Sequence, residues 1–247
     1  MYCDLFNFPY EKNQFRKGEE LRDYNMMDEI ICVSIATAEA FKKRFPKCTS
    51  EVKVIYNPID LDKISYMSRE KNVEYDKFTT ITVGRLTPPK RMDRVIRLAK
   101  RLKDENINNI QFIIIGDGEL HKELNDLINN LDVRDMIKLM GFTKNPFPYI
   151  RAAHMMFIPS SSEGFSLVAC EAMTLGVPIL STKTAGPSEI LKNNEYGLLC
   201  EQDDESIYNA FIQIYKQPEL RKKYAIKGTE RVDDFNIAKT MLQIYKL

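Results

Sequence analysis

From residue 78 onward, short runs of β-branched and other apolar residues alternate with longer segments whose apolar residues recur every three or four positions. The short runs predict strands, and the longer segments predict helices that bury one face. Few polar residues interrupt the short runs, as is typical of strands covered on both faces. The alternation predicts an α/β fold with a doubly wound parallel sheet. The expected strands are 78–84, 110–116, 136–142, 154–159, 177–182 and 197–201.

The same pattern predicts helices between and after these strands, at 91–105, 119–131, 146–153, 166–176, 187–192, 204–216, 218–231 and 235–246. The first 75 residues behave differently. They predict only a helix at 18–27, a strand at 29–35, a helix at 37–45 and the apolar run before Asn57 and Pro58. This is too little for an independent sheet, so we interpret it as the end of a larger amino-terminal domain, followed by a hinge near 56–62.

The predicted organisation therefore has three parts: an amino-terminal remnant at 1–57, a ligand-binding domain at 58–234, and a helix at 235–247 that packs back on the remnant. The 247 residues are enough for one full α/β domain plus a fragment. Lys and Arg number 36 against 35 Asp and Glu, so overall charge does not suggest a nucleic-acid partner, and any anion site must be local.

The five cysteines are widely spaced and form no CxxC pair, which argues against a disulfide framework or a zinc site and favours a reducing cytosol. No apolar run approaches the ~20 residues of a membrane span, and the first residues lack the apolar core of a signal peptide. We therefore expect a soluble, cytoplasmic protein.

Candidate ligand-binding residues follow the expected strands, and in open α/β sheets ligands bind at the carboxyl ends of strands. Gly84, Arg85 and Lys90 follow the first strand, and Gly116 ends the second. A guanidinium and an ammonium in one loop suit a diphosphate. In isolation, two surface cations beside a turn are the better explanation of such a pair, but the convergence of three strand ends on one crevice weakens that interpretation. The sequence GDGEL lacks the third glycine of a dinucleotide fingerprint and predicts a tight turn.

The most informative segment is SSSEGFSLVACEAMTLGVPILST, residues 160–182. Ser166 is predicted to cap a helix that ends near Gly176, and backbone N–H groups of Gly164 to Leu167 would favour an anion there. Glu163 lies in the loop, and Glu171 follows Leu167 on the same helix face. A capped helix beside a solvated acidic loop is the competing interpretation.

The sequence gives little support to a metal site or to a catalytic nucleophile. Asp60 and Asp62 form a carboxylate pair, but they follow the hinge, far in the pattern from the crevice loops. His121 and His154 have no partners at ligand spacing. We expect no metal and no cofactor.

The motifs together resemble the carboxyl-terminal, donor-binding half of a glycosyltransferase of the two-Rossmann-domain type, most closely family 4 of the retaining enzymes. The resemblance covers about 170 residues in matching order, with Glu163 and Glu171 as the family's paired glutamates. It lies in VGRLTPPKRMDRVI (83–96), IIIGDGEL (113–120), KLMGF (138–142), IPSSSEGFSLVACEAMTLGVPIL (158–180), GPSEIL (186–191) and YGLLC (196–200).

The resemblance implies transfer of a sugar, with retention, from a nucleotide diphosphate sugar, with UDP as the expected carrier, to a glycan or lipid-linked acceptor in polysaccharide or glycoconjugate biosynthesis. It implies that Arg85 and Lys90 grip the diphosphate, that Glu171 accepts from the ribose hydroxyls and that Glu163 faces the donor sugar. The remaining implied donor contacts are Gly84, Gly116, Lys138, Leu139, Ser160, Gly164, Phe165, Ser166 and Leu167, with the base near Lys138, Leu139 and Ser160.

The chain departs from the family pattern chiefly in its amino-terminal domain, almost all of which is absent. Turnover by this chain alone is therefore open, and a non-catalytic nucleotide-sugar-binding module is the alternative. A nicotinamide-dependent oxidoreductase is disfavoured by the missing glycine fingerprint. Peripheral contact with the inner face of a membrane, through basic runs such as 42–44, and a homodimer are further expectations; the competing interpretation of such a run is a solvated helix face.

Overall fold

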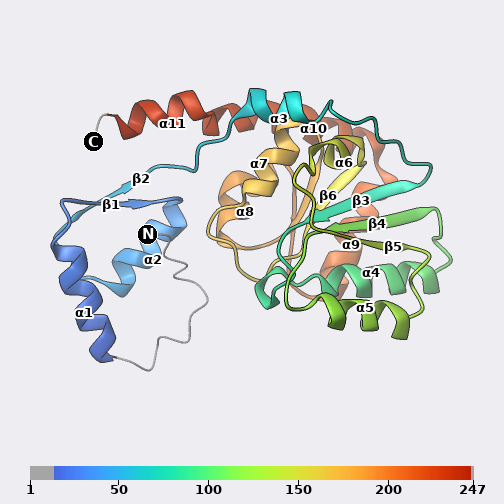
Figure 1. Ribbon diagram of the computed structural model, residues 1–247, viewed down its shortest axis with the longest axis horizontal. Helices are drawn as coiled ribbons and strands as arrows, with labels where there is room; N and C mark the ends of the chain where they lie inside the picture. Colours follow the sequence, from blue (N-terminus) through green and yellow to red (C-terminus); the bar gives the residue numbers. More distant parts are fainter. Residues whose placement is uncertain (1–13, 246–247) are drawn as a thin grey trace.

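The computed structural model describes residues 14–245 (Figure 1). Its main element is a parallel six-stranded sheet in the order β5-β4-β3-β6-β7-β8. Successive strands run outward from β3 to one edge and from β6 to the other, so β3 and β6 flank a topological switch point, where such sheets bind ligands. The strands are β3 (Phe78–Val83), β4 (Ile110–Ile115), β5 (Ile137–Gly141), β6 (Met155–Ile158), β7 (Ile179–Thr182) and β8 (Leu198–Cys200).

Strand β4 shows why the sheet is covered on both faces. Ile110, Phe112 and Ile114 are buried in one hydrophobic cluster, whereas Ile113 and Ile115 are buried in the other. Since successive side chains of a strand point to opposite faces, an unbroken apolar run requires helices on both sides. The prediction of a doubly wound α/β sheet is confirmed.

The two clusters are covered by different helices, and one helix contributes to both. The first cluster includes side chains of α4 (Asp93–Asp104), α5 (His121–Asn130) and α9 (Asp204–Lys216). The second includes side chains of α3 (Leu61–Met67), α6 (Phe147–Ala152), α7 (Leu167–Thr174) and α8 (Ala185–Ile190). Helix α10 (Pro218–Val232) contributes Tyr224 to the first cluster and Val232 to the second. None of the helices among residues 14–245 is long and apolar enough to cross a bilayer.

A smaller unit precedes the sheet and forms the separate blue lobe of Figure 1. It consists of α1 (Gln14–Asn25), β1 (Glu29–Cys32), α2 (Ile35–Arg44) and β2 (Glu51–Val54), with β1 and β2 paired in parallel. Its core is built around Tyr24, Phe41 and Phe45, whose ring centroids lie 4.8 to 5.1 Å apart. Two parallel strands bury little surface, which agrees with the predicted sparse amino-terminal region.

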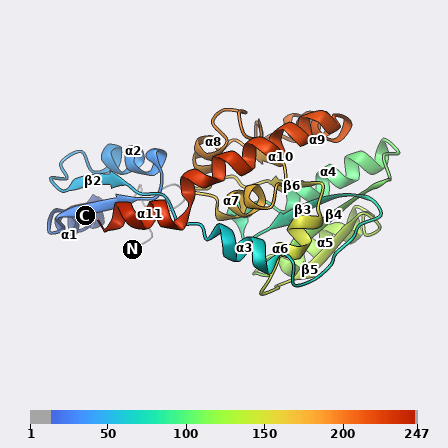
Figure 2. The same cartoon turned by 90° about the horizontal axis from the view of Figure 1, so that it is seen from above.

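Two chain segments connect the lobes and pair with each other. The Ile59 N–H donates to the Phe235 carbonyl at 2.9 Å, and the Ile237 N–H donates to the Ile59 carbonyl at 2.9 Å. After the 3-10 turn η3 (Asp233–Phe235), helix α11 (Ile237–Ile244) extends over the smaller unit in both views (Figures 1 and 2). The predicted domain boundaries themselves stay a prediction.

Several predicted boundaries are wrong for local reasons. The strand predicted at 29–35 ends at Cys32, because Ser34 accepts a hydrogen bond from the Thr37 N–H and starts α2 two residues earlier than expected. The helix predicted at 187–192 is α8 at 185–190, with Pro187 inside its first turn, where a missing N–H costs nothing. Helix α3 was not predicted from the sequence.

Candidate functional site

The loops after β3 and β4 pack backbone against backbone. A Cβ on Gly116 would lie 1.8 Å from the carbonyl oxygen of Gly84, and a Cβ on Gly118 would lie 2.6 Å from that of Leu86. The Leu86 N–H also donates to the Asp117 carbonyl at 2.9 Å. These glycines therefore permit a close approach of two strand ends, as expected for a tight turn.

An ion pair joins the loop after β3 to the loop after β6. Lys90, at the end of the 3-10 turn η2 (Pro88–Lys90), donates through Nζ to the two carboxylate oxygens of Glu163 at 2.8 and 2.7 Å. The Glu163 side chain is only 8% exposed. The N–H of Ser161 donates to the Pro89 carbonyl at 2.8 Å and fastens the same two loops. Two segments about 70 residues apart in the sequence are thus held together at the carboxyl ends of the central strands β3 and β6.

Arg85 is exposed in the first of these loops, and no side chain among the described residues accepts a hydrogen bond from it. It adds a second cation next to Gly84, on which a Cβ would lie 3.8 Å from the Lys90 side chain. An exposed guanidinium and a half-buried ammonium in one loop can hold an anion between them.

The start of α7 offers uncapped backbone donors. Ser166 occupies the cap position, but its side chain makes no capping bond, and its buried Oγ has no hydrogen-bond partner among the described residues. The predicted serine cap is therefore right in position and wrong in its bond, and the helix spans 167–174 instead of 166–176. Leu167, the first helical residue, is 45% exposed. Amides of this first turn are open to an anion.

Glu171 lies one turn into α7 and is largely buried. Burial raises its pKa from the ordinary 4.5 to about 7, and burial is the sole cause of the rise. Among the described residues no cation offsets the desolvation of its carboxylate, which would gain from hydroxyl donors. A ribose diol is one source of two such donors.

The loop after β7 supports the loop that carries Glu163. The Gly186 N–H donates to the Glu163 carbonyl at 2.7 Å, and a Cβ on Gly186 would lie 2.7 Å from Cα of Phe165. Ser160 is buried behind this loop, and its carbonyl accepts from the Thr182 hydroxyl at 2.5 Å. The strand ends of β3, β4, β6 and β7 are therefore in mutual contact.

Two predicted residues lie apart from this contact set. Lys138 lines a cavity of about 510 Å³ with segment 71–77 and Tyr149, and Leu139 packs, partly buried, against the cluster that α4, α5 and α9 cover. The structure brings the loops that carry most of the other predicted residues into contact, and Arg85 and Glu171 belong to elements that take part, the loop after β3 and helix α7. The predicted residues in these loops and at the start of α7 are Gly84, Lys90, Gly116, Ser160, Glu163, Gly164, Phe165, Ser166 and Leu167. The contribution of Lys138 and Leu139 to a base site stays a prediction.

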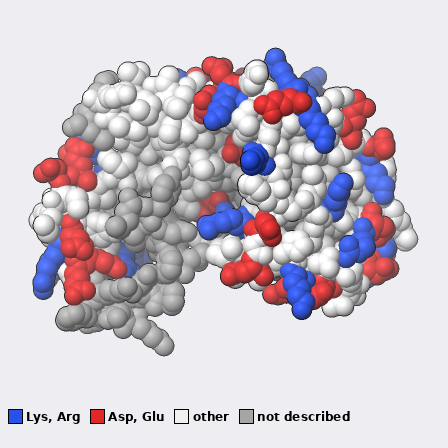
Figure 3. All heavy atoms as spheres, in the orientation of Figure 1, with Lys and Arg blue, Asp and Glu red and all other residues white. Residues whose placement is uncertain are grey.

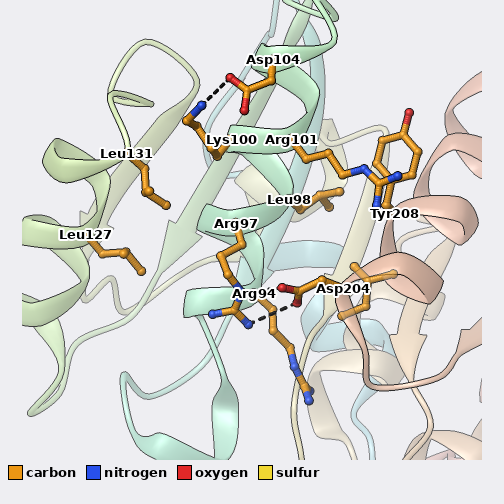
Figure 4. A pocket seen from close by; sticks show the side chains of 11 residues that line it. Arg94, Arg97, Leu98, Lys100, Arg101, Asp104, Leu127, Leu131, Asp204 and Tyr208 are labelled. Atoms are coloured by element: carbon orange, nitrogen blue, oxygen red, sulfur yellow. Dashed lines mark hydrogen bonds and ion pairs between the residues drawn. The ribbon is translucent and has the colours of Figure 1, made fainter.

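A second cavity, of about 450 Å³, lies between α4 and its neighbours α5 and α9 (Figure 4). Its charged side chains are already engaged. Arg97 donates to Asp204 at 2.8 Å, Lys100 is paired with Asp104, and the Arg101 guanidinium lies 3.6 Å from the centroid of the Tyr208 ring. The contacts of Arg97 and Arg101 dock α9 on α4, and the Lys100 pair lies within α4, so the cations here are less available to a ligand than Arg85.

Asp60, the first of the two carboxylates after the hinge, has a structural role. The side chain of Asp60 accepts from the Lys63 N–H at 2.9 Å and caps α3. Across residues 14–245, no three His, Cys, Asp or Glu side chains gather as metal ligands would. On the face seen in Figure 3, cations and carboxylates are mixed over the large lobe, and no extended patch of one sign covers its described residues there.

The candidate site thus lies at the carboxyl ends of the central strands, where the loop of Arg85 and Lys90, the loop of Glu163 and the uncapped start of α7 meet at the switch point. This arrangement is typical of α/β proteins that bind phosphate-bearing nucleotides. The family model of glycosyl transferases group 1 matches residues 66–231, and the chain belongs to that family.

Two curated relatives of the chain are also named as glycosyltransferases. A glycosyltransferase of Methanocaldococcus jannaschii, described as uncharacterized, is 29% identical over 253 residues, which cover 87% of this chain and 62% of the relative. The N-acetylgalactosamine-N,N'-diacetylbacillosaminyl-diphospho-undecaprenol 4-alpha-N-acetylgalactosaminyltransferase of Campylobacter jejuni is 31% identical, covering 87% of this chain and 58% of that protein. The chain spans about 60% of the length of these relatives.

Among solved structures, HepE of Anabaena in complex with UDP has a TM-score of 0.84 and 21% identity, covering 98% of this chain and 69% of that one. At this identity the likeness shows the fold alone. It includes the small amino-terminal unit, because nearly the whole chain is covered.

Proposed function

We propose that this chain is the donor-binding part of a retaining glycosyltransferase of family 4, with UDP as the carrier of the donor sugar. The observation that carries the proposal is the convergence of Lys90, Glu163 and the uncapped start of α7 at the switch point of the sheet. The C. jejuni relative, named for a transfer involving diphospho-undecaprenol, supports a lipid-linked or glycan acceptor. Polysaccharide or glycoconjugate biosynthesis follows as the expected context.

Each side chain suits one part of the donor. An ammonium has three protons, and Lys90 uses two on Glu163, so one remains for the diphosphate beside Arg85 and the first-turn amides of α7. Glu171 accepts from the ribose hydroxyls, and Glu163 faces the sugar. Positive charge around the diphosphate stabilises the leaving group as the bond to the anomeric carbon breaks.

In the proposed transfer, the bond between the anomeric carbon and the diphosphate oxygen breaks while the acceptor oxygen bonds to the same carbon on the same face. The acceptor hydroxyl loses its proton to an oxygen of the departing diphosphate. No metal enters this proposal, because Arg85, Lys90 and backbone amides supply the positive charge. Titration of UDP in EDTA checks that point: affinity should equal that in magnesium buffer.

The decisive measurement is calorimetric titration with UDP and with GDP. We expect saturable UDP binding, weakened on the order of tenfold or more by Lys90→Ala or Arg85→Ala, since each removes a charge-assisted bond to phosphate. Lys100→Ala is the matched control, because Lys100 lies on α4 and is paired with Asp104. No saturable heat with either nucleotide, or equal loss in the control, refutes the assignment.

A non-catalytic module is the alternative, but the named relatives are transferases and do not favour it. Slow hydrolysis of UDP-sugar by this chain, abolished by Lys90→Ala, would distinguish an enzyme from a module. Action at the cytoplasmic face of a membrane, peripheral membrane contact and dimerisation stay predictions, measurable by vesicle co-sedimentation and sedimentation velocity.

A further inference from the structure

Glu189 lies on α8 of the large lobe, which contains the six-stranded sheet, and caps helix α2 of the small lobe, the smaller unit that precedes this sheet. One carboxylate oxygen accepts from the Ile35 N–H at 3.0 Å, and the other accepts from the Ala36 N–H at 3.3 Å. The next N–H in that turn, on Thr37, is capped by the helix's own Ser34 at 3.1 Å. The first turn of α2 is therefore satisfied partly by its own lobe and partly by a residue more than 150 positions away. Helices α2 and α8 face each other between the lobes (Figure 1).

The same carboxylate also holds the segment that connects the lobes. The Tyr56 hydroxyl donates to Glu189 at 2.7 Å. Burial and this bond raise the pKa of Tyr56 to about 12, so the phenol keeps its proton at neutral pH. Glu189 thus joins three separate parts of the chain: α2, the connecting segment and α8.

Helix α8 is in turn attached to the loop after β6 that carries Glu163, called the donor-site loop below. Gly186, three residues before Glu189, bonds the Glu163 carbonyl and touches the Phe165 backbone as described above. The Phe165 ring packs against Tyr56 and Phe235, at centroid distances of 6.0 and 5.5 Å. A Cβ on Gly164 would lie 3.5 Å from Thr37 Oγ1, so the capped turn of α2 also borders this loop. A shift of α2 against α8 would therefore change the position of residues 163–165.

We propose that Glu189 is a positioning residue: its carboxylate sets the placement of the small lobe against the donor-site loop and thereby the geometry of Glu163 and the start of α7. A carboxylate at a helix start is ordinary capping when both belong to one lobe. Here its bonds cross between lobes and come from two segments, the start of α2 and the connecting segment, so breaking them frees a relative motion instead of fraying one helix. The ligand-binding part of this inference rests on the proposed function.

Hydrogen exchange measured by mass spectrometry on the full chain tests the inference in Glu189→Gln. The amide side chain can accept only through its one oxygen, so at least one N–H of the α2 start loses its partner. We expect exchange on the order of tenfold faster in peptides covering 33–41, and faster exchange also in 160–170. Glu230→Gln, an exposed carboxylate on α10, is the control and should leave both peptides unchanged.

UDP titration supplies the readout that a purely structural role would not move. We expect Glu189→Gln to weaken UDP on the order of fivefold at a temperature where its melting curve shows the chain fully folded. Tyr56→Phe keeps the ring and removes one donor to the carboxylate, so it should change exchange and affinity in the same direction by less. If Glu189→Gln does not fold, Tyr56→Phe decides the question.

Unchanged exchange of residues 33–41 in Glu189→Gln would overturn the inference. A second result would also overturn it: faster exchange of 33–41 in this variant, while the exchange of 160–170 and the UDP affinity stay as in the unaltered chain. If the unaltered chain binds no UDP, the proposed function fails, whereas the positioning role is then judged from the exchange of 160–170 alone.

Discussion

Replacement of Glu171 by Gln should make the protein more stable at alkaline pH. Burial raises the pKa of this carboxyl from 4.5 to about 7 in the folded chain. The folded state therefore binds the proton more tightly than the unfolded state does, and stability falls as pH rises from about 4.5 through about 7. Each unit of pKa is worth about 1.4 kcal/mol, so the ionised carboxylate costs about 3 kcal/mol at pH 8.

Glutamine resembles the protonated carboxyl in size and remains neutral at every pH. At pH 5, where the buried carboxyl is mostly protonated, the free energies of unfolding of the two proteins should be close. At pH 8 the variant should be more stable by about 2 to 3 kcal/mol. The gain should be accompanied by weaker UDP binding, because an amide presents one acceptor oxygen where a carboxylate presents two.

Urea unfolding followed by circular dichroism at several pH values between 5 and 8 measures the difference directly. Subtracting the free energies of unfolding of the two proteins removes the contributions of other titrating groups. One of these groups is His154, whose pKa is lowered by burial. Glu230→Gln, on the exposed surface of α10, should follow the unaltered protein at every pH. Identical pH dependence of the unaltered protein and Glu171→Gln would refute the reasoning, since Glu171 would then titrate alike folded and unfolded.

Three further outcomes are expected. Gly116→Ala places a Cβ 1.8 Å from the Gly84 carbonyl oxygen, so it should lower the free energy of unfolding, measured in urea, by more than about 3 kcal/mol. The control Gly141→Ala, also at positive φ but with open space around the new Cβ, should lower it by about 1 kcal/mol. Equal losses in the two variants would contradict the close approach of the loops after β3 and β4. Asp60→Ala should cost about 1 kcal/mol without changing UDP affinity, and a loss of affinity only in magnesium would reinstate the metal role. Phe112→Ala in the core should cost about 3 to 5 kcal/mol by thermal unfolding, and a loss below 1 would mean that the sheet is not covered on both faces.

The strands could be predicted because their apolar runs are long and lack alternation, so few other structures suit them. The segment 110–116 is an example: it became β4 within one residue. Short elements were harder. Helix α3 buries only Ile64 and depends on the Asp60 cap, a pattern that sequence alone assigned to a carboxylate pair. The start of α8 likewise depends on backbone geometry at Thr184, which composition does not reveal.

Most of the predicted site residues came together because parallel strands end at one edge, and a motif after a strand must lie there. The family resemblance implies a base contact for Lys138, which stays a prediction; the structure places Lys138 within β5, where it lines a cavity with segment 71–77. Glu189 was quoted within a motif but given no role. Its partners Ile35 and Tyr56 lie far away in sequence, and no local signal connects them.

By itself, the sequence determined the α/β class, the covered parallel sheet and the residues that follow each strand, because hydrophobic periodicity and turn chemistry are local properties of the chain. Only the tertiary structure decided that Lys90 bonds Glu163, that burial raises the pKa of Glu171, and that Glu189 joins two lobes. Such pairings and desolvation depend on which distant segments the packed core brings within a few ångströms, and local pattern carries no information about those distances.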